Sequence, residues 1–400
     1  MWNRRTLLQA AAATAVLPAV RAEAAAMPGV TATEIKIGNT NPHSGPASAY
    51  GAIANGEVAF FKMINDRGGI NGRKINFITL DDAYSPPKTV EQTRKLVEQE
   101  GVAFIFNGLG TPTQTAVRRY MNARKVPQLF VSTGADKWGD YQHYPWTMGW
   151  QPSYRTEATI YAKYILKEKP DARIAVLYQN DDFGKDYIAG LKDGLGDRYG
   201  KMVIKEVSYE TTDPTIDSHA VTLQSSGANV LVTGATPKWA AQTIRKIAEL
   251  NWHPLHFMTN VSISVGSVLK PAGLENAKGL VTAAYGKDPT DKRWDNDAGM
   301  KEWRAFMAKY MPGADVTDIN HVYAYSVSTS LVQVLKQCGN DLSRANVMKQ
   351  AANLKDEEIP TLLPGIKVNT SPTNFHPIRS MQLSRWTGTT WDLFGDVITA

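Results

Sequence analysis

The sequence has little cysteine and none of the common catalytic motifs. Cys338 is the one cysteine among 400 residues, which excludes an internal disulfide and a metal site built from several cysteines. There is no Gly-x-Ser-x-Gly elbow, no His-Glu-x-x-His pair and no phosphate-binding loop ending in Gly-Lys-Ser or Gly-Lys-Thr. We therefore expect no catalytic residues, and an enzyme is the least favoured of the functions weighed below.

Neither sign of charge dominates the chain. Lys and Arg number 44 against 38 Asp and Glu, and basic residues are interspersed with acidic ones, so we expect no nucleic-acid partner. His253 and His256 are separated by Pro254, and the aspartates of 181–186 and 288–297 lack the spacing of a calcium loop. We expect neither a bound metal nor a cofactor.

One long apolar run is present, near the N-terminus. Residues 7–20 follow Arg4 and Arg5 and precede small residues at 22–26. The run is shorter than the roughly 20 residues that span a bilayer. This pattern predicts a signal peptide over 1–26, cleaved near Met27, and a periplasmic protein. The paired arginines fit a twin-arginine export signal and equally an ordinary charged n-region, and both routes stay open.

Strand-like and helix-like runs alternate along the rest of the chain, as is typical of parallel sheets crossed by helices. A first series runs from a strand at 34–40 to one at 128–131, and a second from Pro152 to a strand at 256–258. After Gly279 we expect helices around 297–311, 320–337 and 343–354, and then a hairpin of 381–386 and 391–394. The repeat predicts an α/β fold with two lobes and a ligand cleft between the carboxyl ends of their strands.

Several separated motifs have the order and spacing of one known family. They are Ser44-Gly45-Pro46, Tyr50-Gly51, 64–74, Asp81-Asp82, 109–114, 132–135, 162–166, 187–195 and 275–279. In these motifs the chain resembles the branched-chain amino-acid-binding proteins over about its whole length after residue 26. The resemblance implies a type I periplasmic-binding-protein fold, with two Rossmann-like lobes joined by three crossover hinge segments.

The resemblance also implies domain limits and partners. The crossovers are expected near 149–153, 283–287 and 367–377. Lobe 1 would comprise 27–150 plus about 284–370, and lobe 2 about 151–283 plus 371–400. A protein of this kind binds a small molecule and delivers it to the membrane permease subunits of an ABC importer, and we expect it to be a monomer.

The family's ligand contacts can be transferred to matching positions. In the first lobe, where helix N-termini bind the ligand carboxylate, the candidates are Leu109, Gly110, Thr111, Thr113, Ser132, Thr133, Gly134, Ala135 and Asp136. The remaining candidates are Tyr50, Trp150, Phe183, Thr236, Asn260, Val261 and Tyr285. Aromatic walls with a few polar groups suit a flat or apolar solute.

Three candidates depart from the amino-acid-binding pattern. Gly110 stands where those proteins present a hydroxyl, and Val261 stands where the acid that pairs with the ligand ammonium is expected. Asp136 replaces a threonine, and its carboxylate would either accept a hydrogen bond from the ligand or cap a helix. We therefore expect an aromatic or apolar organic acid, or a related hydroxylated compound, rather than a branched-chain amino acid. An amino-acid-binding protein and a sensory or regulatory module remain alternatives.

Overall fold

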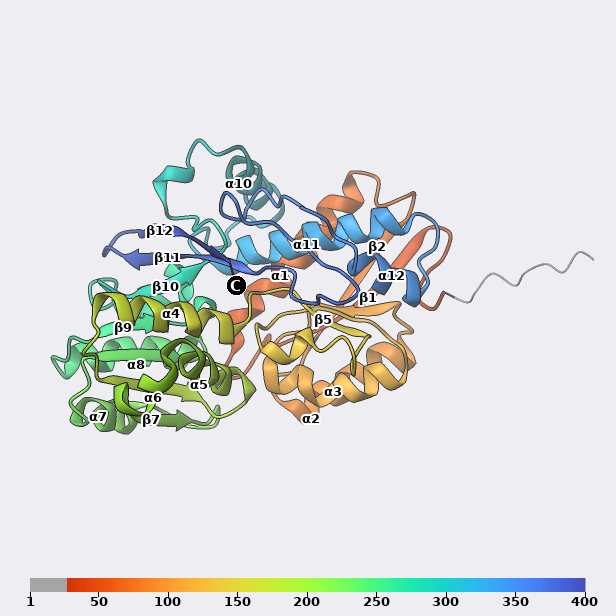
Figure 1. Cartoon of the computed structure of the whole chain (residues 1–400). Coiled ribbons are helices and arrows are strands. Elements are labelled where there is room, and N and C mark those ends of the chain that lie inside the picture. Colours follow the sequence, from red (N-terminus) through yellow and green to blue (C-terminus); the bar gives the residue numbers. More distant parts are fainter. Residues whose placement is uncertain (1–26, 400) are drawn as a thin grey trace, which may run out of the picture.

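The computed structural model describes residues 27–399, which form two groups of strands and helices side by side (Figure 1). The predicted signal peptide lies outside these residues. Within 27–399, no helix has the length and apolar character needed to cross a membrane.

The first sheet is entirely parallel. Its strands are β1 (Glu34–Asn41), β2 (Lys74–Asp81), β3 (Phe104–Phe106), β4 (Gln128–Val131) and β5 (Thr147–Gly149). They lie in the order β2-β1-β3-β4-β5. The helices of this part are α1 (Gly51–Asp66), α2 (Pro86–Arg94) and α3 (Thr111–Ala123). The alternating pattern located these elements except β5, whose sequence Thr-Met-Gly lacks the apolar run that marks the equally short β3.

The second sheet repeats this order and extends it. Its strands are β6 (Ile174–Gln179), β7 (Val203–Tyr209), β8 (Val230–Gly234), β9 (Leu255–Met258), β10 (Val281–Ala284), β11 (Ser380–Trp386) and β12 (Trp391–Thr399). The order β7-β6-β8-β9-β10 matches that of the first sheet, and the β11–β12 hairpin adds two antiparallel strands beside β10. The helices are α4 (Tyr154–Glu168), α5 (Asp182–Leu195), α6 (Tyr199–Met202), α7 (Asp217–Ser225), α8 (Pro237–Glu249) and α9 (Lys270–Ala272).

Three later helices return to the first sheet's side of the molecule. They are α10 (Ala298–Tyr310), α11 (Ile319–Cys338) and α12 (Arg344–Ala351). Trp303 of α10 and Val327 of α11 share one core with Phe60 of α1 and Phe106 of β3. Figure 1 shows α11 beside α1. We call the first sheet with α1–α3 and α10–α12 lobe 1, and the second sheet with α4–α9 lobe 2.

The chain passes between the lobes three times, after β5, after β10 and before β11. Two details differ from the expected pattern. The chain does not turn to helices directly after Gly279, because β10 comes first and pairs with β9 and β11. Phe375 and Ile378 belong to the core of lobe 1, so the third passage lies later than the expected limit at 370.

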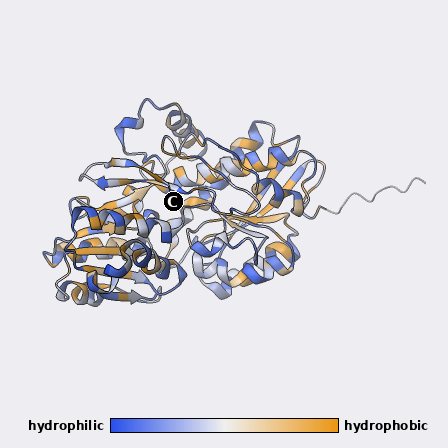
Figure 2. Cartoon of the chain, viewed as in Figure 1, coloured by the Kyte–Doolittle hydropathy of each residue, from blue (hydrophilic) through white to orange (hydrophobic). Residues whose placement is uncertain are grey.

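Each lobe buries its own core. Figure 2 shows hydrophobic colour concentrated on the strands and hydrophilic colour on the outer faces of the helices. The strands of a parallel sheet are covered on both faces, which is why β6 and β8 read as nearly continuous apolar runs. Two separately packed sheets leave the carboxyl ends of their strands facing a common space.

Candidate ligand-binding site

A cavity lies at the carboxyl ends of the strands of both sheets. Tyr50 follows β1, Leu109 follows β3, Phe183 follows β6 and Thr236 follows β8, and all four line it. In each sheet these loops flank the point where the strand order reverses, which is where open α/β sheets bind ligands. The cavity contains about 810 Å³ of empty space, part of which is open to solvent.

Most of the predicted contact residues line this cavity. They are Tyr50, Leu109, Gly110, Thr111, Ser132, Thr133, Phe183, Thr236, Asn260, Val261 and Tyr285. The wall also contains residues that the sequence did not single out, namely Ile53, Tyr84, Gln151, Tyr154, Ile263, Ala284, Gly286, Ile319, Asn320, Val322, Tyr323, Ser326 and Leu362. Several of these additional residues belong to α11, which comes later in the sequence than the cavity loops of both sheets. They are Ile319, Asn320, Val322, Tyr323 and Ser326.

Four further candidates lie behind the wall. The Thr113 hydroxyl donates to the Gly110 carbonyl at 2.9 Å, and the Trp150 indole N–H donates to Ser330 Oγ at 3.0 Å. Gly134 packs against the segment that begins α4, where its carbonyl accepts from the Tyr154 N–H at 2.7 Å. Ala135 is buried at the start of a short 3-10 helix. These residues support the wall and do not line the cavity.

Asp136 also lies outside the cavity lining. Its carboxylate accepts from Ser153 Oγ at 2.8 Å and is 4.0 Å from a guanidinium nitrogen of Arg155. Asp136 is the first residue of the 3-10 helix, whose N-cap is Ala135, so its side chain is no N-cap. Its N–H donates to the Asp186 carboxylate of lobe 2 at 2.7 Å. The structure thus places Asp136 in a polar contact between the lobes rather than in either expected role.

Gly110 begins the lobe 1 wall and has no room for a side chain. It is the N-cap of α3 with φ of 100°, a conformation that favours glycine. A Cβ atom there would lie 2.5 Å from the ring of Tyr84. The Tyr84 ring therefore occupies the space that a hydroxyl-bearing side chain, as in the amino-acid binders, would need at this position.

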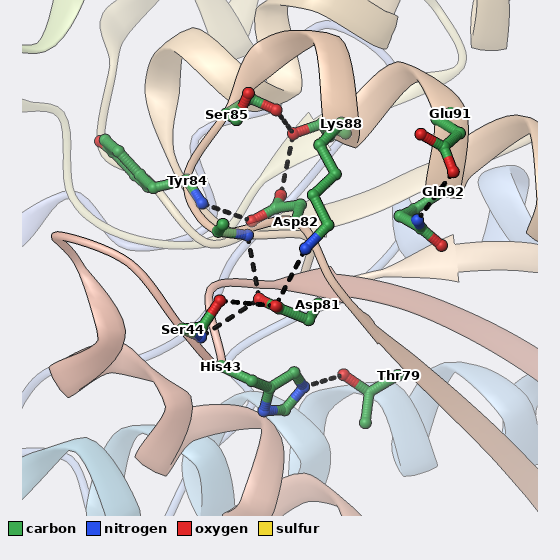
Figure 3. Close-up of polar contacts among 12 residues, drawn as sticks. His43, Ser44, Thr79, Asp81, Asp82, Tyr84, Ser85, Lys88, Glu91 and Gln92 are labelled. Carbon is green, nitrogen blue, oxygen red and sulfur yellow. Dashed lines mark hydrogen bonds and ion pairs between the residues drawn. The ribbon is translucent and has the colours of Figure 1, made fainter.

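A polar loop after β2 fixes Tyr84 (Figure 3). Tyr84 itself has φ of 58°, and its N–H donates to Asp82 at 3.0 Å. Asp82 also accepts from Thr89 Oγ1 at 2.9 Å, and burial raises the pKa of Asp82 to about 6. Neighbouring Asp81 accepts from Ser44 and from Lys88. This loop holds the tyrosine in a backbone region that bulky residues rarely adopt.

Within the described part of the chain, no Asp, Glu, Lys, Arg or His lines the cavity. Its polar groups are hydroxyls, amides and the backbone at the N-terminus of α3, and its tyrosines are Tyr50, Tyr84, Tyr154, Tyr285 and Tyr323. Burial raises the pKa of all five, so they are neutral hydroxyls near pH 7. Ser132 Oγ is buried and has no hydrogen-bond partner among the described residues.

On the lobe 2 side, Asn260 is anchored by a buried carboxyl. Glu157 of α4 accepts from the Asn260 N–H at 2.8 Å, from Asn260 Nδ2 and from Tyr187 OH at 2.7 Å. Burial raises the pKa of Glu157 to about 7, and these hydrogen bonds oppose the rise. Sequence inspection missed Glu157 because its role depends on contacts across about 100 positions.

The lobes touch each other around the cavity. Tyr50 OH donates to the Val261 carbonyl at 3.0 Å, and Gln179 Nε2 donates to Tyr84 OH at 3.3 Å. At the edge, Lys137 Nζ lies 2.8 Å from the Asp182 carboxylate. Two Rossmann-like lobes closed around a neutral, tyrosine-rich cavity define a two-lobed solute-binding protein.

Comparison with known proteins identifies the family. A family model described as periplasmic binding protein matches residues 34–390, and the chain belongs to this family, in its type I, branched-chain amino-acid-binding branch, as the motifs predicted. The chain is 27% identical over 382 residues to the Leu/Ile/Val-binding protein homolog 1 of Brucella abortus, covering 90% of this chain and 95% of that protein. Members of this family are binding proteins rather than enzymes.

Two solved structures share the fold at low identity. A branched-chain amino acid ABC transporter protein from Thermus thermophilus with bound valine superposes with a TM-score of 0.81 at 13% identity, covering 93% of this chain and 98% of that one. A solute-binding protein from R. palustris in complex with 4-hydroxybenzoate gives 0.76 at 16% identity, covering 92% and 97%. One fold thus accommodates both an amino acid and an aromatic acid.

Proposed function

We propose that this chain is the solute-binding component of an ABC importer and that its solute is an aromatic or apolar organic acid. In this proposal residues 1–26 are a cleaved signal peptide, the protein acts in the periplasm, and lobe closure delivers the solute to permease subunits. One observation carries the choice of solute, namely that no Asp or Glu among residues 27–399 lines the cavity to pair with a ligand ammonium.

An amino-acid ligand would bring an ammonium group into this cavity. Burying an ammonium without an opposite charge costs several kcal/mol. At the position where the family's acid is expected, Val261 lines the wall with an apolar side chain. The uncharged wall therefore disfavours amino acids.

A carboxylate can be bound here by neutral groups. The first N–H groups of an α-helix have no partner within the helix and favour anions, and α3 begins at Thr111 beside the cavity. Ser132 lines the same side of the cavity, and its buried Oγ lacks a partner among residues 27–399. The rest of the wall offers aromatic and aliphatic surface, which suits an apolar body.

A binding screen tests the proposed solute class. We expect isothermal titration calorimetry to show that at least one aromatic or apolar acid binds at least tenfold more tightly than leucine or valine. Ser132→Ala should weaken that acid by about tenfold, since it removes a hydrogen bond to a charged group. Ser328→Ala is the matched control, because Ser328 Oγ is likewise buried and unpartnered in the described structure but does not line the cavity. Tight leucine binding with no acid binding would overturn the proposal.

A further inference from the structure

Each lobe contains a buried glutamate that receives the side-chain amide N–H of an asparagine. In lobe 1, Asn107 Nδ2 donates to Glu57 of α1. In lobe 2, Asn260 Nδ2 donates to Glu157 of α4. Both asparagines lie just beyond the carboxyl end of a strand, Asn107 after β3 and Asn260 after β9.

The two asparagines differ in what their amide oxygens receive. Asn107 Oδ1 accepts from Tyr323 OH at 2.8 Å, so both ends of that amide are occupied by the protein. Asn260 Oδ1 accepts no hydrogen bond from the described residues, and Asn260 lines the cavity while Asn107 does not. Lobe 2 therefore offers the cavity an acceptor for which residues 27–399 supply no donor.

The orientation of the Asn260 amide follows from its neighbours. Glu157 Oε2 accepts from Tyr187 OH as well as from Asn260 Nδ2, and Glu157 Oε1 accepts from the Asn260 N–H. Above pH 7, where Glu157 is ionised, a reversed amide would point its oxygen at a carboxylate oxygen, and two acceptors repel each other. Asn260 Nδ2 therefore donates to Glu157, and Asn260 Oδ1 is the atom that can accept a hydrogen bond from a ligand.

We propose that the solute carries a hydroxyl group that donates a hydrogen bond to Asn260 Oδ1, as the Tyr323 hydroxyl does at Asn107. This inference rests on the proposed function and narrows its solute to a hydroxylated organic acid. A hydroxyl fits better than an ammonium because no Asp or Glu of the described chain lines the cavity and the Glu157 carboxyl already accepts from several donors. Asn260 is then a specificity-determining residue.

Ligands that differ only in whether they carry a hydroxyl group test the proposed hydrogen bond to Asn260 Oδ1. Calorimetry of the full mature chain would compare benzoate with its hydroxy, methoxy and fluoro derivatives at each ring position, and alkanoic acids with their hydroxy derivatives. We expect at least one hydroxy acid to bind about tenfold more tightly than both its parent and its methoxy analogue. The methoxy group can accept a hydrogen bond but cannot donate one, so it separates the two kinds of contact.

The variant Asn260→Ala then tests whether Asn260 is the residue that accepts this hydrogen bond from the ligand hydroxyl. The variant should reduce the hydroxyl preference, which is the ratio of the dissociation constants of the parent and hydroxy acids, to less than about threefold. Asn276→Ala is the matched control, since Asn276 lies on the surface of lobe 2 and donates to the Ala272 carbonyl at 2.8 Å. It should retain the full preference.

The possible outcomes separate the two proposals. Equal binding of hydroxy, methoxy and parent acids to the wild-type chain would overturn this inference and leave the solute class intact. A preference that survives in Asn260→Ala would also overturn it, because another residue would be receiving the donor. If no organic acid binds at all, the proposed function fails and this inference fails with it. Should Asn260→Ala not fold, as judged by circular dichroism, the comparison of hydroxy and methoxy acids on the wild-type chain decides.

Discussion

The two lobes contain similar buried glutamates in different hydrogen-bonding environments. Glu57 in lobe 1 receives Asn107 Nδ2 on one oxygen, and its other oxygen has no partner among the described residues. Glu157 in lobe 2 receives donors on both oxygens. Burial raises the pKa of Glu57 far above its ordinary range, whereas the donors limit the pKa of Glu157 to about 7. At equal burial, the number of donors decides how easily a carboxyl ionises.

The largest expected effect is a pH dependence that differs between these glutamates. Folding raises the pKa of Glu157 from about 4.5 to about 7, so its contribution to stability is complete below pH 4.5 and is lost as the pH rises to 7. For this one group the free energy of unfolding should fall by about 3 kcal/mol over that interval. Urea unfolding of the wild type and of Glu157→Gln, from pH 4.5 to 8, measures it as the difference between the two curves.

Glu57→Gln is expected to show its pH dependence at higher pH than Glu157→Gln. Because the pKa of Glu57 is raised further, the wild type should continue to lose stability relative to this variant above pH 7, where the Glu157→Gln difference has levelled off. Two difference curves that level off at the same pH would show that the donors on Glu157 do not set its pKa.

A smaller effect is expected at the helices that begin beside the cavity. Gly110→Ala should lower the free energy of unfolding by about 2 kcal/mol, because φ is positive there and the added Cβ meets the Tyr84 ring. Thr236 is the corresponding N-cap of α8 in lobe 2 and has φ of −74°. Thr236→Ala should cost less than about 1 kcal/mol, since it removes only hydrogen bonds of 3.3 Å. Equal losses in urea unfolding would contradict this difference between the lobes.

The smallest effect is expected at the edge contact between the lobes. Asp182→Asn removes the ion pair with Lys137, whose partners are partly exposed to solvent. Exposed pairs contribute little and are screened by salt, so ligand affinity should fall by less than about fivefold at low salt and be unchanged at 0.5 M. Asp66→Asn is the control, because its partner Lys62 lies on the same helix and the pair does not join the lobes. A larger loss that persists in salt would mean that Asp182 has another role.

Much of the fold was predictable because the alternation of strands and helices is a local property of the sequence. The cavity loops after β1, β3, β6 and β8 were predictable as well, since topology brings strand ends together. The strands β5 and β10 were missed because Thr-Met-Gly and Val-Thr-Ala-Ala contain few large apolar residues, unlike the equally short β3, β4 and β9.

The remaining part of the wall depends on packing between distant segments. Tyr323 and Ser326 reach the cavity from α11, which belongs to lobe 1 although it follows lobe 2 in the sequence. Asp136 lies outside the cavity lining. Its carboxylate accepts from Ser153 and its N–H donates to Asp186, so it contributes to the contact between the lobes. No local pattern reveals which side of a loop faces a ligand.

The hydrogen bond between Tyr50 OH and the Val261 carbonyl closes the space between the lobes beside the cavity. If ligands are bound by lobe closure, as proposed above, a ligand would leave after this bond and the neighbouring lobe contacts had opened. The opening rate would then set a common upper limit to the dissociation rates of all ligands. The rate at which the lobes of the ligand-free protein open, measured by relaxation kinetics, would therefore give the shortest residence time that any ligand can have.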